Sequence, residues 1–221
     1  MPLLVAALLL ALGAALLFGL LGEQVQDQEP VPVDAGATQF LHGFSSPTLD
    51  AVMNLVSFLG SAGFVIPVLA VVTILLYRRR RLPEAIFLAL VYAGSGALNF
   101  LLKLLFHRNR PTFSWSPGAI NDYSFPSGHA MNSLVFYLGL ALVSWMVFGR
   151  RVGVAVLSAG LVIVVLVGIS RVYLGLHYVS DVIGGYAAGL IWLLVAAVAM
   201  RALWNAVGPF LPFAERINRR S

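Results

Sequence analysis

Cysteine is absent from this 221-residue chain, and charged residues make up only 10% of it. The lack of cysteine excludes disulfide bonds, thiolate metal sites and a cysteine nucleophile. Hydrophobic residues account for 60% of the sequence, and the mean hydropathy is +0.91. This is more apolar than the core of a soluble domain requires, so most of the chain is expected to face lipid.

Six apolar runs of near-spanning length alternate with charged or turn-forming segments. They cover Leu3–Leu21, Ala51–Tyr77, Pro83–Phe106, His129–Phe148, Val152–Ile169 and Asp181–Met200. A spanning helix needs about 20 apolar residues, so the sequence predicts an all-α polytopic bundle of six transmembrane helices. We expect a single membrane domain over residues 1–221. The first run could instead be a cleaved signal peptide, but no Lys or Arg precedes it, which favours a retained helix.

The basic residues predict the orientation of the bundle. Ten of the fourteen fall on one side if the runs alternate in direction: Arg78–Arg81, Arg150, Arg151, Arg201, Arg216, Arg219 and Arg220. By the positive-inside rule that side, with both termini, is cytoplasmic. This placement argues against a nucleic-acid partner despite a net charge of +5. The short cytoplasmic ends suggest a multi-pass protein of a bacterial inner (plasma) membrane.

The outer side is expected to hold a loop and surface segment over residues 22–50. Residues 22–36 are polar and broken by proline, which predicts an exposed loop. Phe40, Leu41 and Phe44 suggest a short segment lying on the membrane surface, although a plain helix-entry loop fits equally well. Ser46 could cap the next helix and Pro47 could begin it. Small residues near Gly94 and Gly185 permit close helix contact, within one chain or between two, so the oligomeric state stays open.

Four basic residues fall on the predicted outer side, where positive charge needs another explanation: Lys103, Arg108, Arg110 and Arg171. They belong to polar clusters at the outer ends of predicted helices. The clusters run from Lys103 to Arg110-Pro111, from Pro126 through Ser127 and Gly128 to His129, and from Ser170-Arg171 through His177 to Asp181. Packing of the helices would bring these ends together.

A tetrahedral oxyanion would satisfy this set of cations, and phosphate fits best. Arg110 and Arg171 can grip phosphoryl oxygens with planar guanidinium groups, and Lys103 adds a point charge. The amides of Gly128 and His129 point outward at a helix N-terminus, which favours an anion. Such donors stabilise the charge that spreads over a phosphoryl group during transfer.

Two histidines could divide the remaining chemistry. His177 lies four residues before Asp181, so the carboxylate could fix its tautomer and stabilise an imidazolium. That arrangement suits a nucleophile that forms a phosphohistidine. His129 would then be the general acid for the leaving oxygen, because imidazole titrates near neutral pH.

The three motifs Lys103-x6-Arg110-Pro111, Pro126-Ser127-Gly128-His129 and Ser170-Arg171-x5-His177-x3-Asp181 resemble the signatures of the type 2 phosphatidic acid phosphatase (PAP2) family, membrane-embedded branch. The resemblance implies a metal-independent phosphatase without cofactor. It implies His177 as nucleophile, Asp181 as its support and His129 as acid. It also implies that the phosphate is bound by Lys103, Arg110, Ser127, Gly128 and Arg171. An outward-facing site for a phosphorylated membrane lipid follows, with a motif core over residues 103–181.

Several alternatives stay open at this point. Two histidines and an aspartate can bind metal, but three nearby cations argue against it. A lipid phosphotransferase, or a transporter or scaffold that only binds anionic lipid, would share the cationic site. The substrate could be phosphatidate, phosphatidylglycerol phosphate or a polyprenyl diphosphate. Near the first motif, His107 and Arg108 are expected to snorkel and Asp122 to be solvated, whereas Trp115 and Tyr123 are expected to anchor at the interface.

Overall fold

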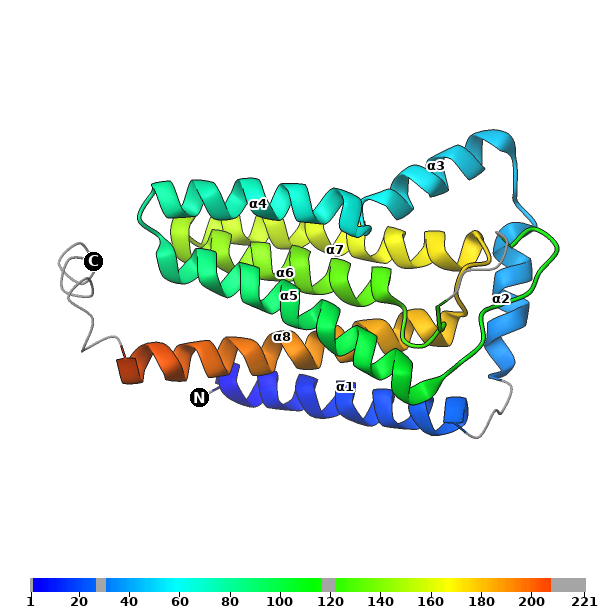
Figure 1. Ribbon diagram of the computed structural model, residues 1–221, viewed down its shortest axis with the longest axis horizontal. Helices are drawn as coiled ribbons and strands as arrows, with labels where there is room; N and C mark the ends of the chain where they lie inside the picture. The colour runs from blue at the N-terminus through cyan, green and yellow to red at the C-terminus, as the bar shows by residue number, and fades with distance from the viewer. Residues whose placement is uncertain (1, 27–30, 117–121, 208–221) are drawn as a thin grey trace.

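The computed structural model describes residues 2–26, 31–116 and 122–207, and within these ranges the chain forms eight helices and no strand (Figure 1). The helices are α1 (Pro2–Gln26), α2 (Pro32–His42), α3 (Pro47–Phe58), α4 (Ala62–Arg78), α5 (Leu82–Phe106), α6 (Gly128–Phe148), α7 (Arg150–Tyr173) and α8 (Val179–Val207). The predicted all-α class is therefore confirmed.

Five of the described helices, α1, α5, α6, α7 and α8, are long and apolar enough to cross a membrane. The pair α3 and α4 passes the same test together but bends by 43°. The prediction of one continuous helix over Ala51–Tyr77 was therefore wrong. Ser61 interrupts it by capping α4, with its hydroxyl accepting from the amide of Phe64 at 3.3 Å. At the bend, Gly60 lies so close to Val167 that a Cβ would come within 2.5 Å of it.

The segment between α1 and α3 is more ordered than its polar sequence predicted. Helix α1 continues to Gln26, and α2 lies across the end of the bundle, where Figure 1 shows it beside the loop that follows α5. The prediction of an exposed loop up to residue 36 was wrong, because Asp34 is buried on the inner face of α2. Phe40 and Phe44 are exposed, and Ser46 accepts from the Leu49 amide at 3.2 Å, which confirms the predicted cap.

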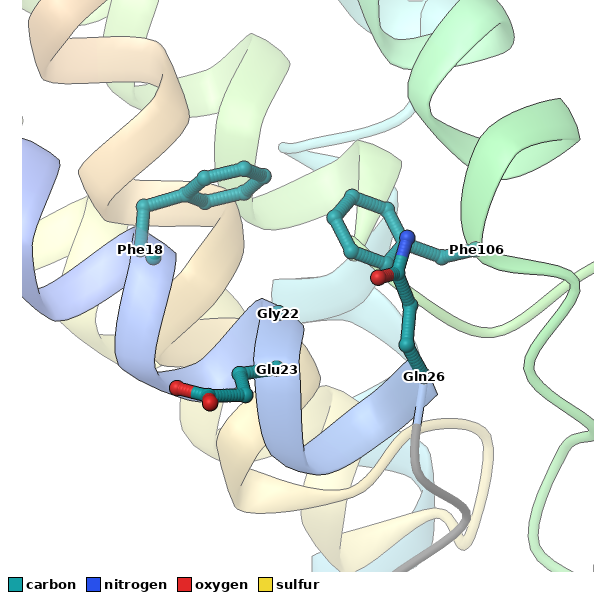
Figure 2. Close-up of a pocket in the computed structure, with 6 residues that line it drawn as sticks. Phe18, Gly22, Glu23, Gln26 and Phe106 are labelled. Atoms are coloured by element: carbon teal, nitrogen blue, oxygen red, sulfur yellow. The ribbon is translucent and has the colours of Figure 1, made fainter.

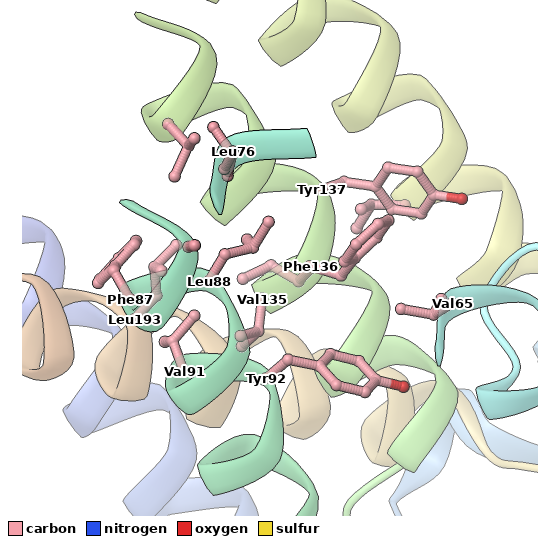
Figure 3. Packing of buried hydrophobic residues seen from close by; sticks show 14 residues of the cluster. Val65, Leu76, Phe87, Leu88, Val91, Tyr92, Val135, Phe136, Tyr137 and Leu193 are labelled. Carbon is pink, nitrogen blue, oxygen red and sulfur yellow. The ribbon is translucent and has the colours of Figure 1, made fainter. Parts of the chain in front are cut away.

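The main core surrounds α6, the central helix of the bundle (Figure 3). Val135 and Phe136 of α6 pack against Leu88 and Val91 of α5, and Val65 of α4 joins the same cluster. All five side chains are at most 2% exposed. A close-packed centre of this kind holds the helix ends in fixed relative positions.

Helix α1 packs along α8 and reaches the end of α5. There Phe18 contacts Phe106 and Phe125, with ring centroids 5.8 and 5.6 Å apart. Beside this aromatic cluster lies a shallow pocket, whose lining includes Gly22, Glu23 and Phe106 (Figure 2). The cluster fixes Phe125, the residue that follows Ser124 in the chain.

Candidate active site

The three sequence motifs meet at the end of the bundle that α2 crosses (Figure 1). Lys103 lies in the last turn of α5 and Arg110 in the segment after it, whereas Ser127 is the N-cap of α6. Arg171 occupies the last turn of α7 and does not follow that helix as the sequence suggested. Asp181 was expected to start the last helix, and it lies in the first turn of α8 as its third residue. The predicted convergence of the helix ends is therefore present.

The turn between α7 and α8 presents His177 to the site. Gly175 adopts a φ of +66°, which favours glycine, and the amides of Leu176 and His177 donate back to the Arg171 carbonyl at 3.0 and 3.2 Å. Helix α8 begins at Val179, after His177. His177 is buried, and its Nδ1 lies 3.4 Å from Oδ2 of Asp181. The two residues form the pair that their spacing predicted.

The neighbours of His177 define its tautomer. Nε2 lies 3.2 Å from Nη1 of Arg110, which can only donate, so Nε2 must be the acceptor. Nδ1 therefore carries the proton and faces the Asp181 carboxylate and the Ser124 hydroxyl, the latter at 3.3 Å. Ser124 in turn donates to Oδ2 of Asp181. This leaves the lone pair of Nε2 directed toward the cationic part of the site.

Burial lowers the pKa of His177 to about 4. The nearby Asp181 carboxylate opposes this shift, whereas Arg171 and Arg110 add to it because they repel an imidazolium. The ring is therefore neutral at pH 7. A neutral imidazole, whose Nε2 lone pair carries no proton, is the reactive form of a histidine nucleophile.

Lys103 and Arg110 share one carboxylate. Lys103 Nζ donates to Asp122 and, at 2.5 Å, to the Tyr123 carbonyl, and Arg110 Nη2 lies 3.3 Å from Asp122 Oδ2. Partial burial raises the pKa of the Asp122 carboxyl, but the hydrogen bond and charge of Lys103, together with Arg110, hold it below its usual value. The expectation that Asp122 is merely solvated was wrong.

Three buried side-chain atoms among the described residues have no hydrogen-bond partner: Nε1 of Trp115, Nε of Arg171 and the hydroxyl oxygen of Ser127. The last two belong to motif residues. Nη1 of Arg171 donates to Ser57 at 2.7 Å, which fixes the guanidinium at the end of α3. Buried polar atoms of native proteins are almost always paired, so this pair of orphaned groups calls for a ligand.

The start of α6 is held by contacts from α8 and from α5. The Ser127 amide donates to the Asp181 carbonyl at 2.9 Å, and Asn99 Nδ2 donates to the Pro126 carbonyl at 3.1 Å. A Cβ on Gly128 would lie 2.9 Å from Asn99 Oδ1, so glycine permits this close approach. His129 follows in the first turn of α6 and is partly buried. Arg171, and His177 when it is protonated, lie near enough to His129 to repel a positive charge on its ring.

Arg108 does not snorkel as the sequence suggested. Its guanidinium lies 2.7 Å from Asp34 Oδ2 and 2.6 Å from Asp181 Oδ1. The reason is local: His107 takes a left-handed conformation with φ of 48°, ends α5, and turns the chain back over the helix ends. The ring of Trp115 stacks on the ring of His42, with the two centroids 4.2 Å apart. The interfacial roles expected of Trp115 and Tyr123 stay predictions.

The site also contains residues that the motifs did not reveal: Asp34, Ser57, Asn99 and Ser124. All four side chains are buried; Ser57, Asn99 and Ser124 bind motif residues directly, whereas Asp34 binds Arg108 and Ser180 beside them. Ser124 lies three residues before Ser127, and Asn99 lies four residues before Lys103. None of the four carried a sequence signal that distinguished them from ordinary polar residues.

A helical membrane bundle with buried cations around a histidine and aspartate pair defines the class of protein: a membrane-embedded protein with an anion site at one end. The sequence matches the PAP2 superfamily over residues 84–205, more than half of the chain. The chain belongs to the PAP2 superfamily, which confirms the family predicted from the three motifs.

Individual relatives support this assignment. Phosphatidylglycerophosphatase B of Bacillus subtilis (strain 168) is 37% identical over 148 residues, covering 66% of this chain and 72% of the relative. Undecaprenyl-diphosphatase of Sulfolobus acidocaldarius is 31% identical over 161 residues, covering 70% and 72%. The crystal structure of a transmembrane PAP2 type phosphatidylglycerolphosphate phosphatase from Bacillus subtilis superposes with a TM-score of 0.76 at 29% identity, covering 87% of this chain and 96% of that one. The predicted class, a multi-pass membrane phosphatase, is thus confirmed.

Proposed function

We propose that this protein hydrolyses a phosphate monoester or diphosphate of a membrane lipid through a phosphohistidine intermediate on His177. The observation that carries the proposal is the pair of orphaned donors, Arg171 Nε and the Ser127 hydroxyl, in a site that also holds a neutral histidine. A phosphoryl group would supply the missing acceptors.

The proposed reaction has two balanced steps. In the first, the Nε2 lone pair of His177 attacks phosphorus, and the bond from phosphorus to the leaving oxygen breaks; this is the lipid oxygen of a monoester or the bridging oxygen of a diphosphate. Protonated His129 donates its proton to that oxygen. In the second, His129 takes a proton from water, the water oxygen attacks phosphorus, and the electrons of the P–N bond return to Nε2. Asp181 holds the Nδ1 proton throughout and stabilises the positive ring in the intermediate.

The remaining motif residues would bind the phosphoryl oxygens. Lys103 and Arg110 contribute positive charge by exchanging Asp122 for substrate, and Arg171 is already oriented by Ser57. Ser127 and the Gly128 amide would donate at the start of α6. Donors fixed in advance need little reorganisation when charge develops in the transition state, which is the main source of catalysis in phosphoryl transfer.

The place of the site in the bundle and the names of the relatives both support a lipid phosphate as the substrate. The site lies at helix ends of a membrane bundle, within reach of a lipid headgroup. Relatives named for phosphatidylglycerophosphate and undecaprenyl diphosphate support phosphatidylglycerol phosphate and polyprenyl diphosphate as candidates. Phosphatidate, which carries the same kind of phosphate monoester, is the third candidate. No metal or cofactor takes part in the proposed steps, because the cations of the chain carry the charge stabilisation.

We place the protein in a bacterial inner membrane with its site on the outer, periplasmic side. The support is charge: Arg78–Arg81 and Arg150-Arg151 lie at the bundle end opposite His177, and the positive-inside rule makes that end cytoplasmic. Both termini would then be cytoplasmic. A binding or transport role would need the cations but not the His177 and Asp181 pair, so hydrolysis is the better supported function. Transfer to a lipid acceptor differs only in the second step.

Phosphate release tests this proposal. The purified protein in detergent is given a panel of lipid phosphates and diphosphates with excess chelator, and wild type is compared with His177→Ala. We expect release by wild type and none by the variant. His107→Asn is the matched control, because His107 is exposed and asparagine tolerates its left-handed backbone. Equal activity of wild type and His177→Ala, or a strict need for divalent metal, would contradict the proposal.

A further inference from the structure

The inner face of α2 carries a buried aspartate that contacts the start of α8. Oδ1 of Asp34 accepts from the Ser180 amide at 2.9 Å, and Oδ2 accepts from the Ser180 hydroxyl at 2.6 Å. Oδ2 also accepts from Nη2 of Arg108 at 2.7 Å. Asp34 is 4% exposed although it lies far from the three motifs in the sequence. A buried carboxylate with this many donors is held in one position.

Arg108 links this carboxylate to Asp181. Its Nη1 donates to Asp181 Oδ1 and to the Ser180 hydroxyl, both at 2.6 Å. The guanidinium also lies over the Tyr178 ring, 4.5 Å from its centroid. Because the fork is planar and rigid, the two carboxylates on either side of Arg108 are fixed relative to each other.

The two oxygens of Asp181 have separate partners. Oδ2 lies next to His177 Nδ1 and accepts from Ser124 and from the Tyr178 amide, whereas Oδ1 is bound by Arg108. Rotation of the carboxylate would break both sets of contacts at once. Arg108 and Asp34 therefore constrain the group that orients the proposed nucleophile.

We propose that Asp34 and Arg108 are positioning residues that act on His177 through Asp181. The inference rests on the proposed function, since it assigns His177 as the reacting group. Helix α2 would then be a working part of the site. Its Asp34 carboxylate would share the positive charge of Arg108 with Asp181, so that Asp181 would not have to balance this charge alone.

The charges of this network give the proposal a distinctive test. Asp34, Arg108 and Asp181 together carry one net negative charge next to His177. The other groups that face His177 are cationic or titratable: Arg110 after α5, Arg171 on α7 and His129 on α6. Asp34→Asn makes the network neutral, which disfavours the imidazolium. Arg108→Gln gives it two negative charges, which favours the imidazolium.

The two substitutions should therefore move the acid limb of kcat/KM in opposite directions. This limb reports protonation of the nucleophile, which must be neutral to attack. We expect Asp34→Asn to move it to lower pH and Arg108→Gln to higher pH, each by about half a unit to one unit. The double variant restores one negative charge and should return the limb toward wild type. Arg108→Lys keeps the charge and should leave the limb near its wild-type position.

The experiment measures kcat/KM on the best lipid phosphate between pH 3 and pH 8 for these variants in detergent. Glu84→Gln is the matched control, because Glu84 is a buried carboxylate paired with Arg81 at 3.4 Å at the other end of α5. It should not shift the limb. Shifts in the same direction, or activity loss without any shift, would overturn the positioning role while His177→Ala remains inactive. Activity of His177→Ala would overturn the proposed function, and this inference with it.

Discussion

Replacing Gly185 with alanine is expected to impair both activity and stability, because this glycine of α8 packs against the backbone of the second motif. A Cβ at position 185 would lie 2.7 Å from the Ser127 carbonyl oxygen and 3.1 Å from the Ala130 Cβ. Side-chain Cβ atoms do not approach other atoms closer than 3.0 Å, so the Ser127 carbonyl must move by at least the difference, 0.3 Å. No flexible side chain is available to absorb this displacement.

The magnitude follows from the position of the contact. Overpacking of a closely packed contact costs about 1 to 3 kcal/mol of unfolding free energy. A misplacement of 1 Å in an active site can cost about a hundredfold in rate, so a shift of a few tenths of an ångström should reduce kcat/KM by roughly three- to tenfold. The loss should fall on kcat/KM because Ser127 and Gly128 begin the proposed phosphate site.

Gly96→Ala provides the control for this measurement. Gly96 also lies within a membrane-spanning helix, but a Cβ there would meet nothing within 4 Å. Thermal unfolding in detergent and phosphate release are measured for both variants. Gly96→Ala should keep the melting temperature and the rate of wild type. If Gly185→Ala matches Gly96→Ala in both assays, the described contact between α8 and Ser127 is wrong.

Three further outcomes are expected. Ser57→Ala removes the hydrogen bond to Arg171. Because hydrogen bonds to charged groups contribute about 1.5 to 3 kcal/mol, kcat/KM should fall on the order of tenfold or more. An unchanged kcat/KM would refute a role for Ser57. Asp122→Asn removes the carboxylate that pairs with Lys103 and Arg110. Inhibition by inorganic phosphate should therefore strengthen by up to about fivefold, which corresponds to the free energy of a half-exposed ion pair. Weaker inhibition would show that Asp122 aids phosphate binding. For wild type, kcat/KM should fall below about pH 4 as His177 becomes protonated, because burial lowers its pKa to about 4; a loss already complete at pH 6 would contradict this assignment.

The sequence predicted the features that depend on local pattern. Hydropathy located the membrane spans, and Ser46 and Pro47 marked the start of α3 where the structure has it. The three motifs also predicted which helix ends meet, because polar groups at membrane helix ends need partners. His177 and Asp181 were paired correctly from their spacing, although His177 precedes α8 and does not lie within it.

Features that depend on tertiary contacts were not predictable from one sequence. Asp34 lies in a polar stretch that resembles a solvated loop, and only its contacts with Ser180 and Arg108 reveal that it is buried. The bend between α3 and α4 interrupts a continuous apolar run, because Gly60 packs against Val167 of α7. Neither contact leaves a periodic pattern in the sequence.

Arg108 shows how a correct observation led to a wrong expectation. Its positive charge on the outer side was recognised as unusual, but its position outside the motif favoured snorkelling at the interface. The structure gives it two buried carboxylate partners instead. A buried cation must be paired, and one of the two partners, Asp34, came from α2, a segment whose helical structure the sequence did not reveal.

Direct detection of the phosphorylated enzyme tests the central claim of this account. A lipid phosphate labelled with ³²P in the transferred phosphoryl group is mixed with the purified protein in chelator, and the reaction is stopped within milliseconds in base, where phosphohistidine is stable. We predict transient label on wild type that is lost in acid and maps to His177, and none on His177→Ala. Rapid phosphate release by wild type without such label, or label on another residue, would contradict the account.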